Sequence, residues 1–372
     1  MLCKNCQRDI PDKAGFCPYC GQKQTGESPA SQPEAQAPAA QKKKGRRKKA
    51  IILSAAAAAL AALIVVGIFV IKPLVFPSDN TPKLSESELK ADREKLPSKT
   101  YLCAGGMHTV GLKNNGYVVA RGSNVVGQCD IDNSVWNNIV EVGAGALHTV
   151  GLKADGTAVA AGSDKNGKCD IGGWKDIASI SAGYYHTLGL KNDGTVVASG
   201  SNKYGQCDLD DWKDIISVRG GNYHTVGLKK DGTVVAKGNN DKGQCDVSDW
   251  TDIVAVSAGN GFTVGVKSDG TVVAVGNNEQ GQCEVEDWKN IVAVSAGAFH
   301  TVGLKADGTA VAAGNDKFRQ SEVEDWKNLV AVSAGDFHTV GLTEKGEIVM
   351  VGSNADKQGA ILYNLDYIKT TD

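Results

Sequence analysis

The chain has 372 residues, of which 41% are hydrophobic and 22% are charged, so its length allows two or three domains. The formal net charge of -2 conceals an asymmetry, because Lys and Arg fill seven of the eight positions 42–49, and it therefore excludes no class of partner by itself. Shifts in composition divide the chain into five regions: a cysteine-rich module (1–24), a Pro/Ala/Gln linker with the basic run (25–49), an apolar segment (50–72), a charged tether (73–99) and a repetitive region (100–372).

Two Cys-x2-Cys pairs lie at the N-terminus, Cys3 with Cys6 and Cys17 with Cys20, and ten residues separate the pairs. Each pair places two thiolates on a tight turn, and together they supply the tetrahedral sulfur set that zinc prefers, with no position left open for water. Metal ligation would provide most of the folding free energy, because so short a segment has almost no apolar core. We therefore expect one structural Zn²⁺ ion at these four cysteines.

A redox role for these cysteines would need a thioredoxin-like α/β context that residues 1–24 do not provide. The segment CQRDIPDKAGFCPYCGQK resembles the short zinc ribbons at the N-terminus of many bacterial membrane proteins, where the ribbon is usually an accessory or interaction element. DNA binding is the weaker hypothesis, because the module has basic residues but no helix or aromatic platform that reads bases. We expect no nucleic-acid partner.

An uncharged apolar segment of 21 residues covers Ile51–Ile71. As a helix rising about 1.5 Å per residue it would span roughly the 30 Å hydrocarbon core of a bilayer. It has no polar stripe and lies between polar linkers, which argues against a buried Ala-rich helix. It begins too far from the N-terminus for a cleaved signal peptide. We therefore predict a single transmembrane helix over residues 50–72.

The charges on the two sides of this span predict its orientation. The basic run abuts its N-terminal end, whereas Lys72 and scattered mixed charges follow it, so we expect the N-terminus in the cytoplasm and the repeats outside the plasma membrane. Nucleic-acid binding or nuclear targeting is the alternative role for the basic run, but its position favours topology and contact with anionic lipids. The linker at 25–41 is predicted to be flexible, and Ser85–Leu96 to form a short helix.

Seven copies of one sequence fill the chain from Tyr101 onward, best seen at Trp288–Gly314 as WKNIVAVSAGAFHTVGLKADGTAVAAG. Each copy is one supersecondary unit that cannot bury its apolar face alone, so the units must pack on one another. The copies follow each other at steps of 40 and then 38 residues, set by a His-Thr pair in six copies and by Phe262-Thr263 in the other. The paired histidines are His108, His148, His186, His224, His300 and His338.

Within each copy, apolar residues alternate with small or polar ones, as half-buried strands require. This predicts strands at Val292–Ser295, Thr301–Lys305 and Thr309–Ala313, with a short fourth strand allowed at 282–285. The Asp-Gly between the second and third strands predicts a two-residue type I′ turn. Closure into a ring protects sheet edges that an open solenoid would expose, and both ends of the repeat region carry the same phase. We predict an all-β, seven-bladed β-propeller preceded by the zinc ribbon and the transmembrane helix.

The unit A-G-x-x-H-T-V-G-L-K-x-D-G-T-V-V-A-x-G-x-N-x-x-G-Q resembles the regulator-of-chromosome-condensation (RCC) repeat over essentially all of residues 100–372. The copies are shorter than in the nuclear exchange factor that names the family and are more similar to compact bacterial propellers, including a secreted β-lactamase-inhibitory one. The resemblance implies protein binding. It does not imply guanine-nucleotide exchange, which depends on a nuclear GTPase and on loops that this chain lacks.

Residues that recur at one phase are expected to be structural, because catalysis needs a unique constellation. For the histidines, the alternatives are metal binding or pH sensing. For the six tryptophans, we expect packing between blades rather than ligand stacking. The cysteines of the Gly-x-Cys positions are expected not to pair, since equivalent positions on adjacent blades exceed the roughly 7 Å that a disulfide spans, and to replace a buried aliphatic residue. They are Cys129, Cys169, Cys207, Cys245 and Cys283.

Residues that differ between copies are better candidates for binding. The pair before each His-Thr is rich in aromatics, and rigid corners that carry Tyr or Phe are typical of protein hot spots. The alternative is that these side chains only cover the core. The candidate contact residues are Met107, Leu147, Tyr184, Tyr185, Asn222, Tyr223, Phe299, Asp336 and Phe337. A second variable corner includes Val125, Val126, Asn166, Lys203, Tyr204, Asp241, Lys242, Glu279, Gln280, Lys317, Phe318 and Arg319.

The repeats contain no Ser-His-Asp arrangement, phosphate loop or unique carboxylate pair, so we expect no enzyme. The sequence indicates a membrane-anchored extracytoplasmic binding protein that uses one propeller face to hold a protein or cell-surface ligand. A glycan-acting enzyme is the alternative, which two or three non-repeating carboxylates in a central pocket would favour. A third hypothesis is a sensor that signals to the cytoplasmic ribbon, although one span carries such a signal poorly without dimerisation.

Overall fold

The computed structural model describes residues 84–85, 87–88, 90 and 101–361. The predicted zinc ribbon, basic run and transmembrane helix lie outside these residues. Among the described residues, no helix has the length and apolar character needed to cross a membrane. The same residues contain no group of three or more His, Cys, Asp or Glu side chains that could hold a metal ion.

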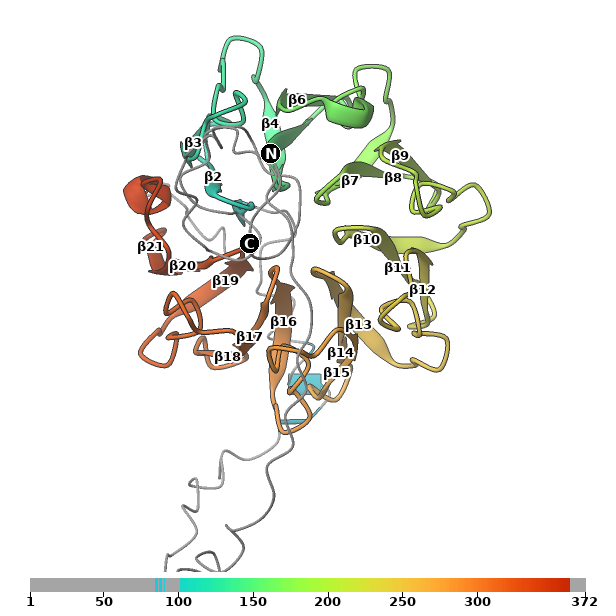
Figure 1. Cartoon of the computed structure of the whole chain (residues 1–372), viewed down its shortest axis with the longest axis vertical. Helices are drawn as coiled ribbons and strands as arrows, with labels where there is room; N and C mark the ends of the chain where they lie inside the picture. The colour runs from blue at the N-terminus through green and yellow to red at the C-terminus, as the bar shows by residue number, and fades with distance from the viewer. Residues whose placement is uncertain (1–83, 86, 89, 91–100, 362–372) are drawn as a thin grey trace, which may run out of the picture. The chain divides into compact units, whose positions relative to one another are not determined.

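Seven three-stranded antiparallel sheets follow one another along the described chain. Figure 1 shows them arranged as blades around a central axis, with the seventh next to the first. The blades, numbered in chain order, are β1 (Leu102–Ala104), β2 (His108–Leu112), β3 (Val118–Gly122); β4 (Ile139–Ala144), β5 (His148–Lys153), β6 (Ala158–Gly162); β7 (Ile177–Ala182), β8 (His186–Lys191), β9 (Val196–Gly200); β10 (Ile215–Gly220), β11 (His224–Lys229), β12 (Val234–Gly238); β13 (Ile253–Ala258), β14 (Phe262–Lys267), β15 (Val272–Gly276); β16 (Ile291–Ala296), β17 (His300–Lys305), β18 (Ala310–Gly314); β19 (Leu329–Ala334), β20 (His338–Thr343), β21 (Ile348–Gly352). Two short 3-10 helices are η1 (Lys165–Gly167) and η2 (Gln358–Ile361).

The predicted strands agree with β16, β17 and β18 to within one residue, but the fourth strand is wrong. At 282–285 the backbone turns instead, because its polar groups are satisfied locally. The amide of Cys283 donates to Oδ1 of Asn278 at 2.9 Å, and the amide of Val285 donates to the carbonyl of Cys283 at 3.0 Å. These local bonds occupy amides that a fourth strand would need for its ladder.

The Asp-Gly hairpins also differ from the predicted type I′ turns. Gly156 has φ of 79°, but Asp155 does not share a positive φ, and the amide of Gly156 donates to the carbonyl of Lys153. The chain therefore makes a type I turn followed by a left-handed glycine, the common three-residue hairpin. Asp155 favours this form because its Oδ1 accepts hydrogen bonds from the amide and the hydroxyl of Thr157, at 2.9 and 2.6 Å.

Tryptophan packing explains the glycine in the middle of each second strand. A Cβ atom at Gly151 would lie 2.8 Å from Cζ3 of Trp136, so only glycine lets the indole lie flat on the strand. Trp136 also packs with Val110 and Leu112 of the preceding blade. The predicted packing of tryptophan between blades is confirmed, and six blades repeat the Trp–Gly contact.

Six hydrogen bonds between blades link the buried histidines to the threonine of the next blade. Each His Nε2 lies 2.8–3.0 Å from a threonine Oγ1, as in His148 with Thr187, and the bond from His338 to Thr109 crosses from the last blade to the first. The histidines expected to be structural therefore join each sheet to its neighbour. Phe262 takes the seventh position and makes no such bond.

The threonine determines that Nε2 of the imidazole carries a proton. In five of the six pairs the threonine hydroxyl donates to a backbone carbonyl at 2.7 Å, which belongs to Gln128 or to the residue at the same place in another repeat. Because the hydroxyl proton is used in this way, the threonine oxygen must accept the hydrogen bond from the imidazole. These five histidines therefore carry a proton on Nε2, and burial, which lowers their pKa, keeps the rings neutral near pH 7. The glycine before each corner is required here, because a Cβ at Gly145 would overlap the His148 ring.

The described part of the tether begins a helix against blade six. The amide of Ser85 donates to Oε2 of Glu88 at 2.8 Å, and the amide of Glu88 donates back to the Ser85 hydroxyl at 3.4 Å, which is a capping box. The amide of Leu84 donates to Oδ1 of Asn290 at 2.8 Å, and its side chain packs between blades six and seven. The start of the predicted helix is thereby located.

The buried histidines predict that the propeller loses stability in acid. Burial lowers the pKa of His108, His224 and His300 to about 4 and that of His186 and His338 to about 3. An unfolded histidine protonates near pH 6.5, so between about pH 6.5 and 4 only the unfolded chain takes up these protons, and the free energy of unfolding falls as pH falls. Denaturant unfolding at pH 5–7 should show this slope.

Two reciprocal substitutions test the assignment. His224→Phe copies the Phe262 arrangement and should reduce the proton uptake on unfolding at pH 5 by about one proton. Phe262→His should increase it by about one, because Thr301 keeps its bond to the Gln282 carbonyl and can accept. An unchanged slope in both variants would show that these rings do not govern the acid response.

Candidate functional site

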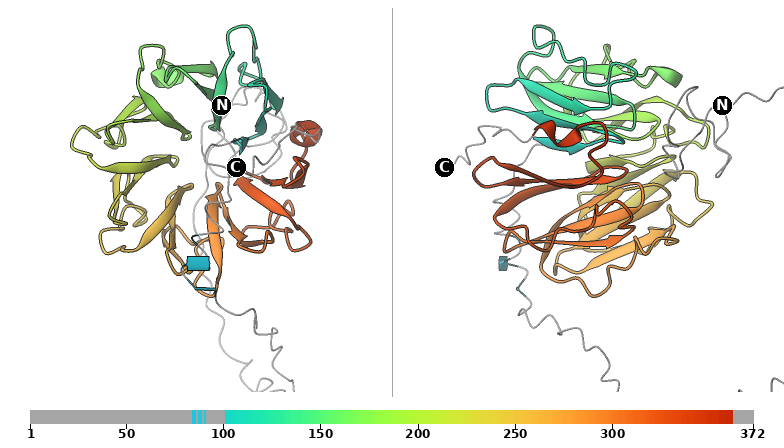
Figure 2. Two further views of the ribbon diagram at one scale, coloured as in Figure 1. Left: turned by 180° about the vertical axis from the view of Figure 1, so that it is seen from behind. Right: turned by 60° about the vertical axis from the view of Figure 1, so that its left-hand side comes forward.

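The propeller has two unlike faces, which we name by their turns. The corner face carries the turns between the first and second strands, such as Gly183–Tyr185, and the loops after the third strands. The amide of Ser201, after β9, donates to the carbonyl of Tyr185 at 2.9 Å, so both kinds of turn share this face. The hairpin face carries the Asp-Gly turns. Figure 2 gives an oblique view in which the strands run from one face to the other.

All nine candidate contact residues lie on the corner face and are half-buried. They are neither fully exposed nor part of the sealed core, so they cover the ends of the sheets while leaving part of each side chain accessible. The two roles considered for these residues from the sequence, contact with a ligand and coverage of the core, are therefore compatible. The structure also brings the second variable corner against the first.

Four tyrosines form one contiguous group over blades three and four, which we call the tyrosine cluster. The ring centroids of Tyr184 and Tyr185 lie 4.5 Å apart, and Tyr185 stacks on Tyr223 at 4.7 Å. Tyr204, from the loop after β9, meets Tyr223 edge-on at 5.3 Å. The Nζ of Lys203 lies 4.9 Å from the Tyr204 centroid, which adds a positive charge at the edge of the cluster.

A second group, the phenylalanine cluster, repeats this arrangement over blades six and seven. Phe299 stacks on Phe337 at 5.9 Å, and Phe318 meets Phe337 edge-on at 5.3 Å. Lys317 lies 5.8 Å from the Phe318 centroid. These positions follow those of Tyr185, Tyr204, Tyr223 and Lys203 by 114 residues, which is three repeats. The remaining candidates, Met107, Leu147, Asn222 and Asp336, belong to neither cluster.

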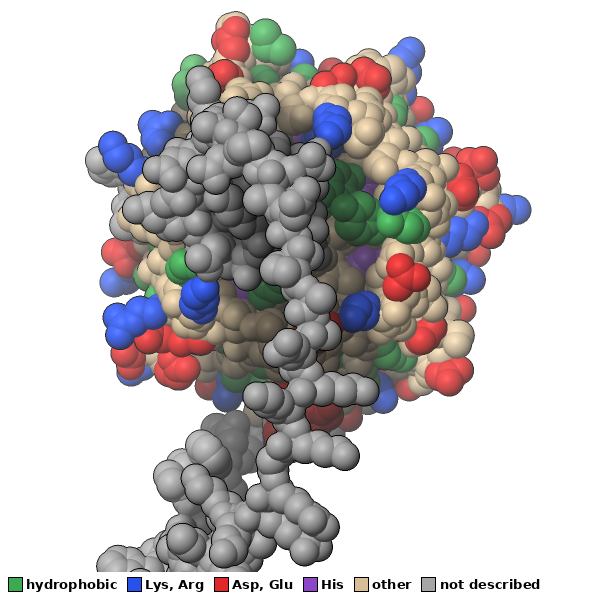
Figure 3. All heavy atoms as spheres, in the orientation of Figure 1, with side chains coloured by type: hydrophobic (Ala, Val, Ile, Leu, Met, Phe, Trp, Pro, Cys, Tyr) green, Lys and Arg blue, Asp and Glu red, His purple; other side chains and the backbone are tan. Residues whose placement is uncertain are grey.

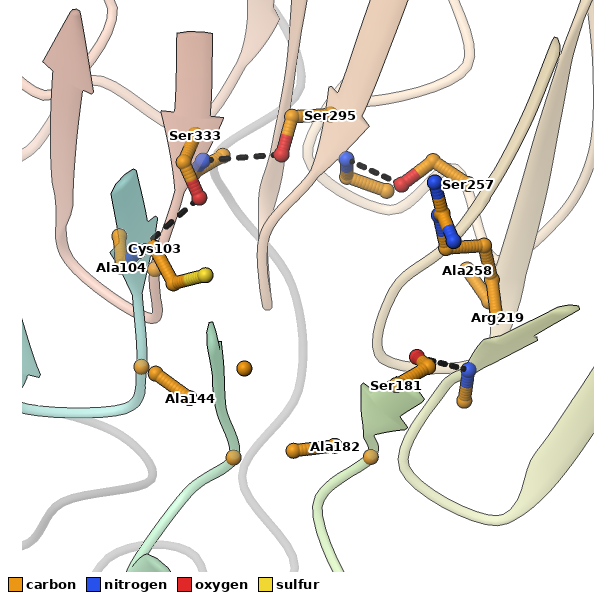
Figure 4. A pocket seen from close by; sticks show the side chains of 18 of the residues that line it. Cys103, Ala104, Ala144, Ser181, Ala182, Arg219, Ser257, Ala258, Ser295 and Ser333 are labelled. Carbon is orange, nitrogen blue, oxygen red and sulfur yellow. Dashed lines mark hydrogen bonds between the residues drawn. The ribbon is translucent and has the colours of Figure 1, made fainter. Parts of the chain in front are cut away.

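A central cavity of about 590 Å³ runs between the first strands of the seven blades, and Tyr184, Asn222 and Asp336 line it at the corner face. Its wall is mostly alanine, glycine and serine. Four serines stitch neighbouring blades together around it, because each hydroxyl accepts a hydrogen bond from the next blade's backbone amide at 2.9–3.1 Å (Figure 4). These serines are Ser181, Ser257, Ser295 and Ser333.

Three blades depart from serine at this position. Blade one has Cys103, whose thiol donates to the carbonyl of Val142 at 3.0 Å, and burial raises the pKa of this thiol to about 12. Blade two has Gly143, and blade four has Arg219. Arg219 extends from β10 and lies beside Ser257 in Figure 4. Its Nη1 donates to the carbonyl of Val218 at 2.9 Å.

A second departure lies two residues earlier in the first strands. Blade two has a buried Glu141, whose Oε1 accepts a hydrogen bond from the hydroxyl of Ser179 in blade three at 3.0 Å. Blade four has Ser217, whereas blades five to seven all have alanine here. The polar side of the cavity therefore lies on blades two to four, the same side as the tyrosine cluster. Sequence reasoning missed Glu141 and Arg219, although aligning the first strands would have revealed both.

The repeat cysteines act differently from the expected aliphatic replacements. Each Sγ donates to the backbone carbonyl six residues earlier at 3.4–3.5 Å, and Ser321 makes the equivalent bond at 3.2 Å. All five are free thiols, and burial raises their pKa to about 11. Their position requires a small hydrogen-bond donor, which serine also supplies.

Lys168 is a buried cation in the position that glutamine takes elsewhere. Its Nζ donates to the Ser163 hydroxyl and to the Lys165 carbonyl, both at 3.3 Å, and burial lowers its pKa. Figure 3 shows charged side chains of both signs around the rim of the visible face, with hydrophobic and backbone surface toward its middle. The rim of the visible face therefore carries charges of both signs.

The sequence of five blades matches the regulator of chromosome condensation (RCC1) repeat, at residues 177–206, 215–244, 253–282, 291–320 and 329–358. The described region is an RCC1-repeat β-propeller. The resemblance to RCC repeats is thus confirmed for the propeller. A search of curated proteins finds no match to the chain.

Three solved structures show the same fold at low sequence identity. Prp20p from Saccharomyces cerevisiae is 18% identical, with a TM-score of 0.52 over 70% of this chain and 84% of that one. The CRINKLY WD40 ectodomain of the Arabidopsis thaliana receptor kinase ACR4 is 19% identical, with a TM-score of 0.54 over 68% and 97%. The ectodomain of the Physcomitrella patens receptor kinase CR4 is 19% identical, with a TM-score of 0.55 over 68% and 72%.

Asp336 predicts a pH-dependent stability difference at the mouth of the cavity. Burial raises the pKa of its carboxyl to about 7, so ionisation destabilises the folded state as pH rises from about 4 to about 7. Asp336→Asn removes this effect and should raise the free energy of unfolding at pH 8 by roughly 1–3 kcal/mol. The gain should vanish near pH 4. Denaturation of both proteins at the two pH values measures it, and an equal gain at both would contradict the cause.

Proposed function

We propose that the chain is a membrane-anchored binding protein whose corner face holds a protein or cell-surface ligand outside the plasma membrane. The RCC1-like propeller is a fold generally used for protein binding. The observation that carries the proposal is the pair of aromatic clusters on one face. Their rings are half-buried on rigid corners, except for the exposed Tyr204, and each cluster is edged by a lysine. Rigid, amphipathic tyrosines contribute large contact area at low entropic cost.

The likeness to other propellers supports this proposal in general terms. Prp20p is described by its binding to Gsp1p and histones, and the other two structures are ectodomains of receptor kinases. An ectodomain on a single span is the arrangement that the basic run and the apolar segment at 51–71 predict for this chain. At 18–19% identity, none of these partners is transferred.

The glycan-acting alternative has two observations in its favour: two non-repeating carboxylates, Glu141 and Asp336, line the central cavity, and burial raises the pKa of Asp336. A glycosidase needs two carboxyl groups that converge on one bond. Glu141 lies in the middle of β4 and accepts from Ser179, whereas Asp336 lies at the corner of blade seven. Binding therefore remains the function that we propose first, and the sensor hypothesis would add to it rather than replace it.

Truncation of the tyrosine cluster should abolish ligand capture. We expect Tyr185→Ala with Tyr223→Ala to weaken retention at least thirtyfold, because central aromatics each contribute about 2 kcal/mol or more. The matched control is Tyr117→Ala, an exposed tyrosine (54%) on the hairpin face. The measurement is retention of cell-surface proteins and glycans on the full chain in detergent, followed by mass spectrometry. Equal losses in both variants, or no loss in either, would contradict the proposal.

The membrane topology and the zinc site are tested together in intact cells. A membrane-impermeant thiol reagent should label Ser248→Cys, an exposed propeller position, and should not label Cys3, Cys6, Cys17 or Cys20. After permeabilisation, a chelator should release one zinc per chain and make the ribbon thiols reactive. Labelling of the ribbon from outside would refute the orientation, and a chain without zinc would refute the metal site.

A further inference from the structure

Arg219 departs from the repeat at a position where serine links blades. Serine here accepts the amide of the next first strand, as Ser257 does for Ala296 at 2.9 Å. Arg219 offers no hydroxyl to the equivalent amide of Ala258, so blade four gives up the contact that its neighbours make. In return a guanidinium enters the central cavity.

The guanidinium has few partners in the described part of the chain. One bond is present, from Nη1 to the carbonyl of Val218 at 2.9 Å, and no ion pair between described residues includes Arg219. A guanidinium has five N–H donors, so most of its capacity is available. It is half-buried in the cavity wall, where an added anion would be poorly screened by water.

The surroundings select the kind of anion. Glu141 and Asp336 line the same cavity, so a doubly charged phosphate or sulfate would meet more repulsion than a carboxylate with a single charge. Tyr184 and Asn222, in the corners that flank β8 and β11, line the cavity too. A ligand lying on the tyrosine cluster can thus reach Arg219 without leaving a continuous surface.

We infer that the central cavity receives a carboxylate from a protein segment bound on the tyrosine cluster, and that this carboxylate pairs with the guanidinium of Arg219. The carboxylate belongs to an Asp or Glu side chain or to a C-terminus, and the planar fork of arginine suits it in a bidentate pair. This inference rests on the proposed binding function of the corner face. It adds the chemistry of the residue that enters the cavity.

The test is affinity selection of soluble random peptides with free C-termini on the full chain in detergent, followed by titration of individual peptides. Bound peptides should share an Asp, a Glu or a required C-terminal carboxylate. Changing that acid to its amide should weaken binding at least tenfold. Arg219→Ser should cause a similar loss, and the two changes together should cost little more than either alone.

Two controls separate binding from folding. Arg219→Ser restores the residue found in four other blades and should keep or raise the midpoint of thermal unfolding, since the hydroxyl can accept from Ala258. Arg121→Ser is the matched control, because Arg121 is exposed and also donates to the carbonyl of its preceding residue, at 2.8 Å. It should leave peptide affinity unchanged.

The outcomes distinguish this inference from the proposed function. Peptides that need Tyr185 and Tyr223 but bind Arg219→Ser as tightly as the wild type would overturn the carboxylate pair and leave the binding face intact. A failure to select any peptide would count against both. Binding of free glutamate or acetate that competes with no peptide would assign the cavity to a small carboxylate and overturn the protein segment as its source.

Discussion

The hydrogen bond from each histidine Nε2 to the threonine of the next blade is the constraint on which the other repeated residues depend. It needs a proton on Nε2, because the threonine donates its own proton to a carbonyl and must accept from the imidazole. It needs a glycine at the preceding corner, because a Cβ there would overlap the imidazole. The same bond from His338 to Thr109 joins the last blade to the first. A local motif thereby specifies a closed ring rather than an open solenoid.

Because the ring is specified by repeated contacts, residues that leave the pattern are free to serve another purpose. The blade-four corner keeps its glycine and its bond from His224 to Thr263, although Arg219 replaces the serine of the inner ring. Loss of one net hydrogen bond costs about 1 kcal/mol, a small amount beside the remaining contacts between blades. The fold can therefore place a charged group in the cavity without changing the strand register.

Much of the fold was predictable because strand alternation and repeat phase are local signals. The bounds of β16, β17 and β18 and the tryptophan packing follow from them. The hairpin type could not be predicted, since the side chain of Asp155 and its bonds to Thr157 decide between two turns that Asp-Gly allows. The candidate corners were predicted in sequence but their grouping was not, because the contact of Tyr204 with Tyr223 joins different blades.

The two blades that the RCC1 repeat does not match carry several departures from the pattern. The RCC1 repeat is matched from residue 177 onward, whereas blades one and two hold Cys103, Glu141 and Lys168. Both nevertheless retain the contacts that close the ring, from His108 to Thr149 and from His148 to Thr187. The carbonyl of Lys168 still accepts from Thr187, so the departures in these blades change side chains and leave the histidine bonds between blades in place. The polar wall of the cavity, on blades two to four, likewise combines altered side chains such as Glu141 and Arg219 with intact histidine bonds, which is why chemistry and closure coexist in one ring.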